Sequence, residues 1–382
     1  MTKKAKKLEV SILIIILFIF SIVILYSESS FGFEQNTYFN ILNMKKALEK
    51  YENIFQDGGW DKISARKVLK IDDYGEEIVL LRKRLIITGD LLDNNEDNKN
   101  KEIFDHTLEE AVKNFQLRHG LIATGIVDQN TLNELNIPIR IRIKQIQKNI
   151  ERMKSYTEKL KGNYLIVNIP DFQLHVVENN KAVMKMKVIV GSLNSPTPVF
   201  SRKITYLVLN PTWIIPYRSS VVVILPRIHK DPEYLEKNNI NVFKGWGDET
   251  VKINSDSIDW SKVNTNNMKY RFVQEPGPLN PMGLVKFKFP NKYNVYLHDT
   301  PKQYLFKRKT RTFSAGCVRI EEPIKLAEYI LQDRSEWNQK NINSIIKSGK
   351  KKTITLNNPF PVHMVYWTVW STDDGLIHFR KD

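Results

Sequence analysis

Hydrophobic positions recur at helical spacing through the first part of the chain. Between Asn40 and Phe55 they fall three or four residues apart, which predicts an amphipathic helix within a helical scaffold over residues 27–79. A second helical patch covers Leu80 to Leu92. The polar, asparagine-rich stretch from Asp93 to Lys101 has no apolar face, so we expect a surface loop there.

A compact pair of helices is expected over residues 80–138. Thr107 and Glu110 have the spacing of a capping box at the start of one helix, and Asp128 can cap the next. An apolar stripe then predicts a connecting helix over residues 139–162.

Beyond the connecting helix the pattern changes to the alternation typical of strands. Asn179 and Asn180 separate two strand-like runs and predict a hairpin turn. Residues 218–273 are polar with scattered aromatics, which predicts a capping insertion between strands that belong together. We therefore expect an α+β protein with a β-rich catalytic domain over 163–335 and a C-terminal segment, 336–382, packed on the scaffold.

The N-terminal residues predict a membrane segment. Lysines are frequent in residues 1–7, and a nearly unbroken apolar run follows at residues 8–26. Its uncharged part is about 17 residues long, the lower limit for crossing a bilayer. Because basic residues stay in the cytoplasm, we predict a single transmembrane signal-anchor that exports the body of the protein. A cleaved signal peptide is the alternative, but residues 27–30 match a cleavage site poorly.

The chain is strongly basic, with 58 Lys and Arg against 42 Asp and Glu and a formal net charge of +16. The positive residues are spread along the sequence, and neither zinc-finger spacing nor an aromatic RNA-binding signature accompanies them. We therefore expect no nucleic-acid partner. The charge instead favours attraction to an anionic polymer outside the cytoplasm.

Cys317 is the only cysteine, so it can form neither an internal disulfide nor a zinc site built from several thiolates. It lies in the run Ser314–Arg319, where small residues give access and Arg319 favours the thiolate. This pattern favours a nucleophile, and a buried structural cysteine is the alternative.

His298 ends a strand-like run upstream of the cysteine and is the candidate base for its proton. The other histidines lack partners at the spacing of metal ligands. We expect no metal and no cofactor.

Two runs together resemble the active-site signature of the L,D-transpeptidases of bacterial cell walls. They are Val295–Pro301, which contains His298, and Arg311–Arg319, which contains Cys317. Residues 111–136 resemble the small helical peptidoglycan-binding domain, and a bundle that only supports the neighbouring domain is the alternative. The stretches 210–213 and 274–283, with 365–368, 374–375 and 379–380 near the C-terminus, resemble the larger Gram-negative branch with a capping insertion. One departure is Ala315, where many members carry a histidine.

The resemblance implies roles for individual residues. Cys317 and His298 would be catalytic, and the main chain of Asp299 would orient the imidazole. Amide groups at the Gly316–Cys317 turn would stabilise the oxyanion. The remaining candidates are Ser314 at the oxyanion site and Arg319, Tyr296, Trp213 and Asn280 for substrate binding. Arg319 could instead be a structural ion-pair partner, and Trp213 could be core or cleft wall.

The resemblance also implies the reaction. A thioester would form on the cysteine with release of D-alanine from a peptidoglycan stem peptide, and the amine of a second stem would resolve it into a 3→3 cross-link. L,D-carboxypeptidase activity or D-amino-acid exchange by the same acyl-enzyme is the alternative, and a non-catalytic cell-wall anchor is another.

The implied setting is the inner membrane, spanned once, with the catalytic domain in the periplasm. The expected partners are donor and acceptor stem peptides, the cytoplasmic membrane through the N-terminal helix, and other cell-wall synthases. The insertion is expected to act as a lid.

Overall fold

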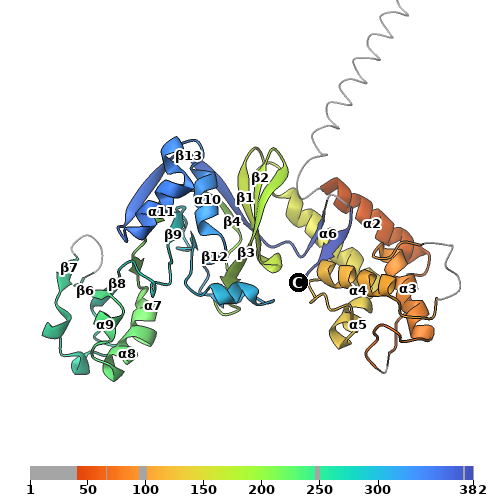
Figure 1. Ribbon diagram of the computed structural model, residues 1–382, viewed down its shortest axis with the longest axis horizontal. Coiled ribbons are helices and arrows are strands. Elements are labelled where there is room, and N and C mark those ends of the chain that lie inside the picture. Colours follow the sequence, from red (N-terminus) through yellow and green to blue (C-terminus); the bar gives the residue numbers. More distant parts are fainter. Residues whose placement is uncertain (1–40, 66, 94–100, 246–249, 373–374, 382) are drawn as a thin grey trace, which may run out of the picture. The chain divides into compact units, whose positions relative to one another are not determined.

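The computed structural model describes residues 41–65, 67–93, 101–245, 250–372 and 375–381. They form two compact units (Figure 1). One is helical and contains residues up to Gly162, Glu178–Lys181 and the chain from Trp367 onward. The predicted membrane segment lies outside the described residues, and within them no helix is long and apolar enough to cross a membrane.

The helical unit has a core built from the predicted helix pair and the segment before it, with Leu81, Phe104 and Phe115 fully buried. The start of α4 differs from the prediction, since the carboxylate of Asp105 accepts the Leu108 amide at 2.8 Å and Thr107 is not the cap. Its elements are α2 (Ile41–Gln56), α3 (Glu76–Thr88), α4 (His106–Arg118), α5 (Gln129–Leu135), α6 (Ile139–Lys154), β14 (Val369–Ser371) and β15 (Ile377–Phe379).

The β-rich unit contains a nine-stranded sheet in the order β11-β3-β12-β10-β9-β4-β13-β1-β2. Because β2 also pairs with β3, the sheet curls back on itself. The predicted turn between these two strands is confirmed, with positive φ at Asn179 and Asn180. The strands are β1 (Tyr164–Asn168), β2 (Gln173–Glu178), β3 (Lys181–Gly191), β4 (Phe200–Leu209), β9 (Val285–Lys288), β10 (Leu297–His298), β11 (Thr312–Ser314), β12 (Val318–Ile320) and β13 (Lys352–Val365).

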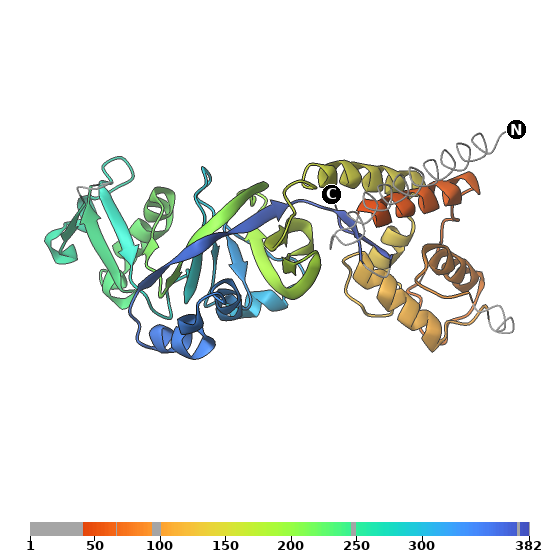
Figure 2. The ribbon, with the colours of Figure 1, turned by 90° about the horizontal axis from the view of Figure 1, so that it is seen from above.

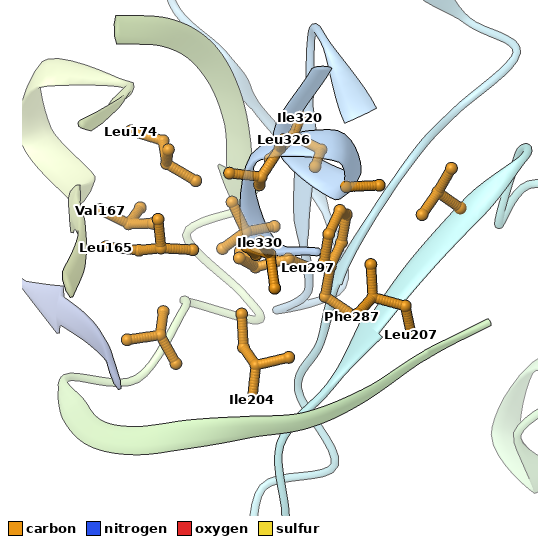
Figure 3. Close-up of a cluster of buried hydrophobic side chains, with 14 of the residues drawn as sticks. Leu165, Val167, Leu174, Ile204, Leu207, Phe287, Leu297, Ile320, Leu326 and Ile330 are labelled. Carbon is orange, nitrogen blue, oxygen red and sulfur yellow. The ribbon is translucent and has the colours of Figure 1, made fainter. Parts of the chain in front are cut away.

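One face of this sheet packs against two helices, α10 (Pro323–Ile330) and α11 (Gln339–Lys347). Figure 3 shows Leu326 and Ile330 of α10 beside Phe287 and Leu297 of the sheet. Side chains alternate along each strand, so the residues between these core positions lie on the opposite face. That opposite face carries the chemistry described below.

The predicted insertion is a subdomain with its own core, which includes Ile224, Leu235 and Phe272. Its four-stranded sheet has the order β5-β8-β6-β7. The subdomain begins at Trp213, before the predicted first residue 218, and ends at Gln274, one residue after the predicted last residue 273. Its elements are β5 (Trp213–Ile214), α7 (Tyr217–Ser219), α8 (Leu225–Lys230), α9 (Tyr234–Lys237), β6 (Ile240–Lys244), β7 (Val251–Ile253) and β8 (Tyr270–Gln274).

The prediction that residues 336–382 pack on the scaffold is wrong for their first part. The long strand β13 pairs with β4 on one side and β1 on the other, inside the β-rich unit (Figure 2, blue). Only the chain from Trp367 onward belongs to the helical unit. The C-terminal end of β13, from Val362 to Val365, is fully or almost fully buried, in line with its place inside the sheet.

Candidate active site

The cysteine lies at the end of a turn that hydrogen bonds hold from two sides. Gly316 has φ +108°, a conformation that side chains disfavour. The buried hydroxyl of Thr197 donates to the Gly316 carbonyl at 2.9 Å and accepts the Gly191 amide at 2.9 Å. The Ser314 hydroxyl accepts the Gly316 amide at 3.1 Å and donates to the Cys317 carbonyl. The turn therefore has a fixed conformation.

Strand pairing brings the predicted residues together. His298 on β10 lies opposite Arg319 on β12 in a parallel pair and opposite Lys286 on β9 in an antiparallel pair. The Val318 amide donates to the Tyr296 carbonyl at 3.0 Å, which places Cys317 next to the residues preceding His298. Since Leu297, Phe287 and Val318 are core residues, the side chains of His298, Lys286, Arg319 and Cys317 lie on the face away from the core.

His298 is buried and held by a main-chain contact. Its Nδ1 lies 2.5 Å from the Asp299 carbonyl oxygen, the contact that the resemblance implied. Because a carbonyl can only accept, Nδ1 carries the hydrogen and Nε2 is the basic nitrogen. Burial lowers the pKa of His298 to about 3, and the charges of Arg319 and Lys286 act in the same direction. The imidazole is therefore neutral at physiological pH.

The Asp299 carboxylate fixes the segment that precedes β9. Its Oδ2 accepts the Leu284 amide at 2.8 Å, and its Oδ1 accepts Nε2 of Gln303 at 3.1 Å. Gly283 has φ +63°, and a Cβ there would lie 2.3 Å from Asp299 Oδ2, so only glycine fits. Burial raises the pKa of Asp299. Its carboxylate thus supports the same residue whose carbonyl contacts His298.

Cys317 is half-buried, and its Sγ lies 3.9 Å from the Asn294 carbonyl oxygen. Burial raises the pKa of Cys317, while a backbone hydrogen bond from Tyr296 and the positive charges of Lys286, Arg319 and Lys288 act against this rise. The resting group is consequently a thiol, and among the described residues the acceptor of its hydrogen bond is the Asn294 carbonyl and not His298.

Arg319 is half-buried and has no carboxylate within ion-pair distance among the described residues. Its Nε is buried without a hydrogen-bond partner in that part of the chain. Burial lowers the pKa of Arg319, and the nearby Cys317 sulfur raises it. The structure therefore does not provide the ion pair that would make Arg319 a purely structural residue.

The two main-chain amides of the cysteine turn differ in whether they are free to bind an oxyanion. The Gly316 amide already donates to Ser314, so in this conformation it is not available to a substrate. The Cys317 amide has no partner among the residues that the structure describes. The Cys317 amide is therefore the donor that the turn leaves for a developing charge.

Two predicted substrate contacts have other surroundings. Asn280 is 0% exposed and its amide group donates to the carbonyls of Pro211, Gln274 and Glu275, while its oxygen accepts the Met282 amide. In this structure Asn280 joins the two ends of the insertion, and its binding of substrate stays a prediction. Trp213 is half-buried and packs against the core of the inserted subdomain, in line with the core alternative.

Sequence reasoning missed three residues near the cysteine. Lys286 and Lys288 both contact the Tyr296 ring, with their Nζ atoms 4.1 and 4.0 Å from its centre. Thr197 holds the cysteine turn. The alternation of lysine with Val285 and Phe287 was the available signal, because it separates a core face from a polar face.

Comparisons with known proteins identify the families that this chain resembles. The family described as L,D-transpeptidase catalytic domain (YkuD) matches residues 162–353, and the family described as "Putative peptidoglycan binding domain" matches residues 74–135. A "Putative L,D-transpeptidase" of Haemophilus influenzae is 32% identical over 216 residues, which are 56% of this chain and 43% of that protein. The chain thus spans less than half the length of this curated relative.

Two solved structures are also similar. An L,D-transpeptidase from Stackebrandtia nassauensis is 16% identical, with 78% of this chain and 94% of that chain covered and a TM-score of 0.26. L,D-transpeptidase 3 from Mycobacterium tuberculosis with a faropenem-derived adduct is 10% identical, with 53% and 60% covered and a TM-score of 0.25. The match over residues 162–353 spans half of the chain, and by it this protein belongs to the YkuD family of L,D-transpeptidase catalytic domains.

Proposed function

We propose that the protein is a cysteine L,D-transpeptidase that forms 3→3 cross-links between peptidoglycan stem peptides. The observation that carries the proposal is the placement of His298 and the Cys317 turn on adjoining strands, with the Asp299 carbonyl on Nδ1. This contact leaves Nε2 as the basic nitrogen on the same face as the thiol.

In the proposed first step, the sulfur of Cys317 attacks the carbonyl carbon of the donor amide while His298 Nε2 takes the thiol proton. The Cys317 amide donates to the resulting oxyanion. When this intermediate collapses, the C–N bond breaks, the imidazolium gives its proton to the departing D-alanine amine, and a thioester remains.

In the proposed second step, the amine of a second stem attacks the thioester carbonyl and His298 accepts its proton. The C–S bond then breaks, the imidazolium returns its proton to the departing sulfur, and a new amide joins the two stems. A neutral histidine suits both steps, because the base must be unprotonated before each attack.

We propose that Arg319 binds a carboxylate of the substrate. What supports this role is its position beside His298, its buried Nε without a partner, and the lack of an acidic neighbour among the described residues. A guanidinium can bind a carboxylate through two hydrogen bonds, which would fix the orientation of the peptide.

We propose that the inserted subdomain, from Trp213 to Gln274, is a lid. It leaves the sheet where β4 ends and returns where β9 begins, and the start of β9 pairs with the His298 end of β10. Water competes with the acceptor amine for the thioester, so closure over the site would favour transfer. Deleting the subdomain should raise the ratio of hydrolysis to cross-linking, and an unchanged ratio would argue against a lid.

The reaction is tested with purified protein and a disaccharide tetrapeptide. We expect release of D-alanine and formation of a cross-linked dimer, while Cys317→Ala should abolish both. Hydrolysed tripeptide without any dimer would assign carboxypeptidase activity instead. Activity that persists in the Cys317→Ala protein would overturn the proposed nucleophile.

We propose that this reaction takes place outside the cytoplasm, with the N-terminal apolar run anchoring the protein in the inner membrane. The lysines of residues 1–7 and the apolar residues 8–26 support this orientation. Protease added to spheroplasts should digest the catalytic domain, and full protection in intact spheroplasts would contradict the proposal.

A further inference from the structure

A group of positive charges without acidic partners lies on the far side of His298 from Arg319. Lys286 and Lys288 project from β9 with their ammonium groups close to the Tyr296 ring. Neither lysine has a carboxylate within ion-pair distance in the described part of the chain. Lys351 adds a further positive charge near Lys286.

This arrangement is unfavourable without an anion. Both lysines are half-buried, and each positive charge raises the electrostatic energy of the other. Burial, together with the charge of Lys288, lowers the pKa of Lys286 to about 8, and the Cys317 sulfur acts in the opposite direction. The ring of Tyr296 stabilises the ammonium groups only in part, since a cation–π contact is worth about 1 kcal/mol at an accessible site.

The positions of these charges separate them from Arg319. Lys286 on β9 and Arg319 on β12 are the strand-pairing partners of His298 on β10. Positive charge therefore lies on both sides of His298. A transpeptidase has two peptide substrates, and each brings carboxylates to the thioester.

We propose that Lys286, Lys288 and the Tyr296 ring form a second carboxylate-binding site beside Cys317, distinct from Arg319, which holds a carboxylate of one of the two stem peptides. The inference rests on the proposed function for the identity of its ligand. The site attracts the carboxylate as a pair of point charges, whereas the guanidinium on the other side offers a planar pair of donors.

Because Cys317 is the only cysteine, its alkylation tests the site without any peptide. Iodoacetate is a carboxylate and iodoacetamide is its neutral analogue, so the ratio of their rates measures the local attraction of a carboxylate. Any change in the thiol pKa alters both rates and cancels in the ratio. We expect the Lys286→Gln/Lys288→Gln protein to lower this ratio roughly tenfold.

Lys325→Gln is the matched control, because it removes one lysine from α10 on the core side of the sheet, where Glu322 pairs with it at 3.0 Å. It should leave the ratio unchanged. An unchanged ratio in the double lysine variant, with a decrease in Arg319→Gln, would overturn the second site and leave Arg319 as the sole anion site.

Peptides then identify the source of the carboxylate. Stem peptides with the free carboxylate of diaminopimelate amidated are used once as donor and once as acceptor. The double variant should lose about tenfold in kcat/KM for the carboxylate form of one substrate and little for its amide. Equal losses for both forms would overturn the inference while the function stands. A wild-type protein that makes no cross-link would refute the function, and the alkylation ratio would still test the site.

Discussion

Selected cations of the two units have different partners. In the helical unit, Arg118 binds the fully buried Asp90 with two of its nitrogens, and Arg142 binds Glu134. In the β-rich unit, the charges of Lys286, Lys288 and Arg319 act on Cys317, and none of the three has a carboxylate at ion-pair distance in the described residues. Arg84 of the helical unit is also buried without a carboxylate at ion-pair distance among the described residues, but its Nε donates to the Leu135 carbonyl and its guanidinium lies 3.6 Å from the centre of the Trp60 ring.

The difference separates structure from function. A buried cation with an internal carboxylate is neutralised during folding and stabilises the assembly around it. A half-buried cation that lacks such a partner can attract a negatively charged ligand or transition state, and its uncompensated charge lowers the stability of the fold. The comparison therefore predicts that removing charges in the first unit affects folding, and that removing charges in the second affects activity.

The largest expected effect is on stability, from Asp90→Asn. The substitution leaves the buried Arg118 charge without its counter-ion, which should cost about 3 kcal/mol of unfolding free energy. Chemical denaturation of the purified protein measures this, with the exposed Glu151→Gln as control. The activity per folded molecule should stay at the wild-type value. A selective loss of activity would contradict the conclusion that charges in the helical unit serve stability.

The next effect is on activity, from Arg319→Gln. Loss of a charged contact to the substrate should lower kcat/KM by about 100-fold, because a charge-assisted bond contributes about 2–3 kcal/mol. Steady-state kinetics with the tetrapeptide provide the measurement, and Arg202→Gln, at an exposed position of β4, is the control. We expect a denaturation midpoint close to the wild type. A strongly destabilised Arg319→Gln protein would assign this residue a structural role after all.

A smaller effect is expected from Thr197→Val. The change leaves the Gly316 carbonyl and the Gly191 amide without their buried hydroxyl partner, at a cost of about 2 kcal/mol. Loosening of the cysteine turn should also slow acylation. Thr205→Val is the control, since its hydroxyl makes only a 3.4 Å contact with the Lys288 carbonyl. Equal effects of the two changes would argue against a special role for the turn.

The smallest effect on stability at neutral pH concerns two buried histidines. Burial lowers the pKa of both His175 and His298 to about 3, while an unfolded histidine titrates near pH 6.5. Between these values the unfolded chain binds more protons than the folded one, so stability decreases as the pH falls from 6.5 towards 3. His175→Gln should lower the number of protons taken up on unfolding by about one, which makes the slope of stability against pH smaller, and should leave activity intact. His298→Gln should reduce the same pH dependence and also abolish activity.

Local signals in the sequence predicted local structure well. The Asp128 cap is confirmed, since its carboxylate accepts the Thr131 amide at 2.8 Å, and so is the turn at Asn179 and Asn180. The cap by Thr107 was wrong because Asp105, two residues earlier, offers a carboxylate at the same helix end. Competition between neighbouring caps depends on where the chain enters the helix, which no short motif specifies.

Non-local structure was predicted less well. The pattern of β13 is interrupted by Pro359 and Pro361, and its place between β4 and β1 depends on strands distant in sequence. The role of Asn280 was missed for the same reason, since its partners include the distant Pro211. Cys317 and His298 could be identified because a short motif carries them, whereas the lysines became visible only when register placed them on one face.

The position of β13 has a consequence for how the protein matures. The chain is synthesised from its N-terminus, so Cys317 and His298 are made before residues 352–365, which pair with both β4 and β1. Contacts between residues this far apart in sequence form late. A nascent chain therefore carries the Cys317 thiol on an unfinished sheet, and this thiol gains its rigid surroundings only when a strand remote from it is inserted.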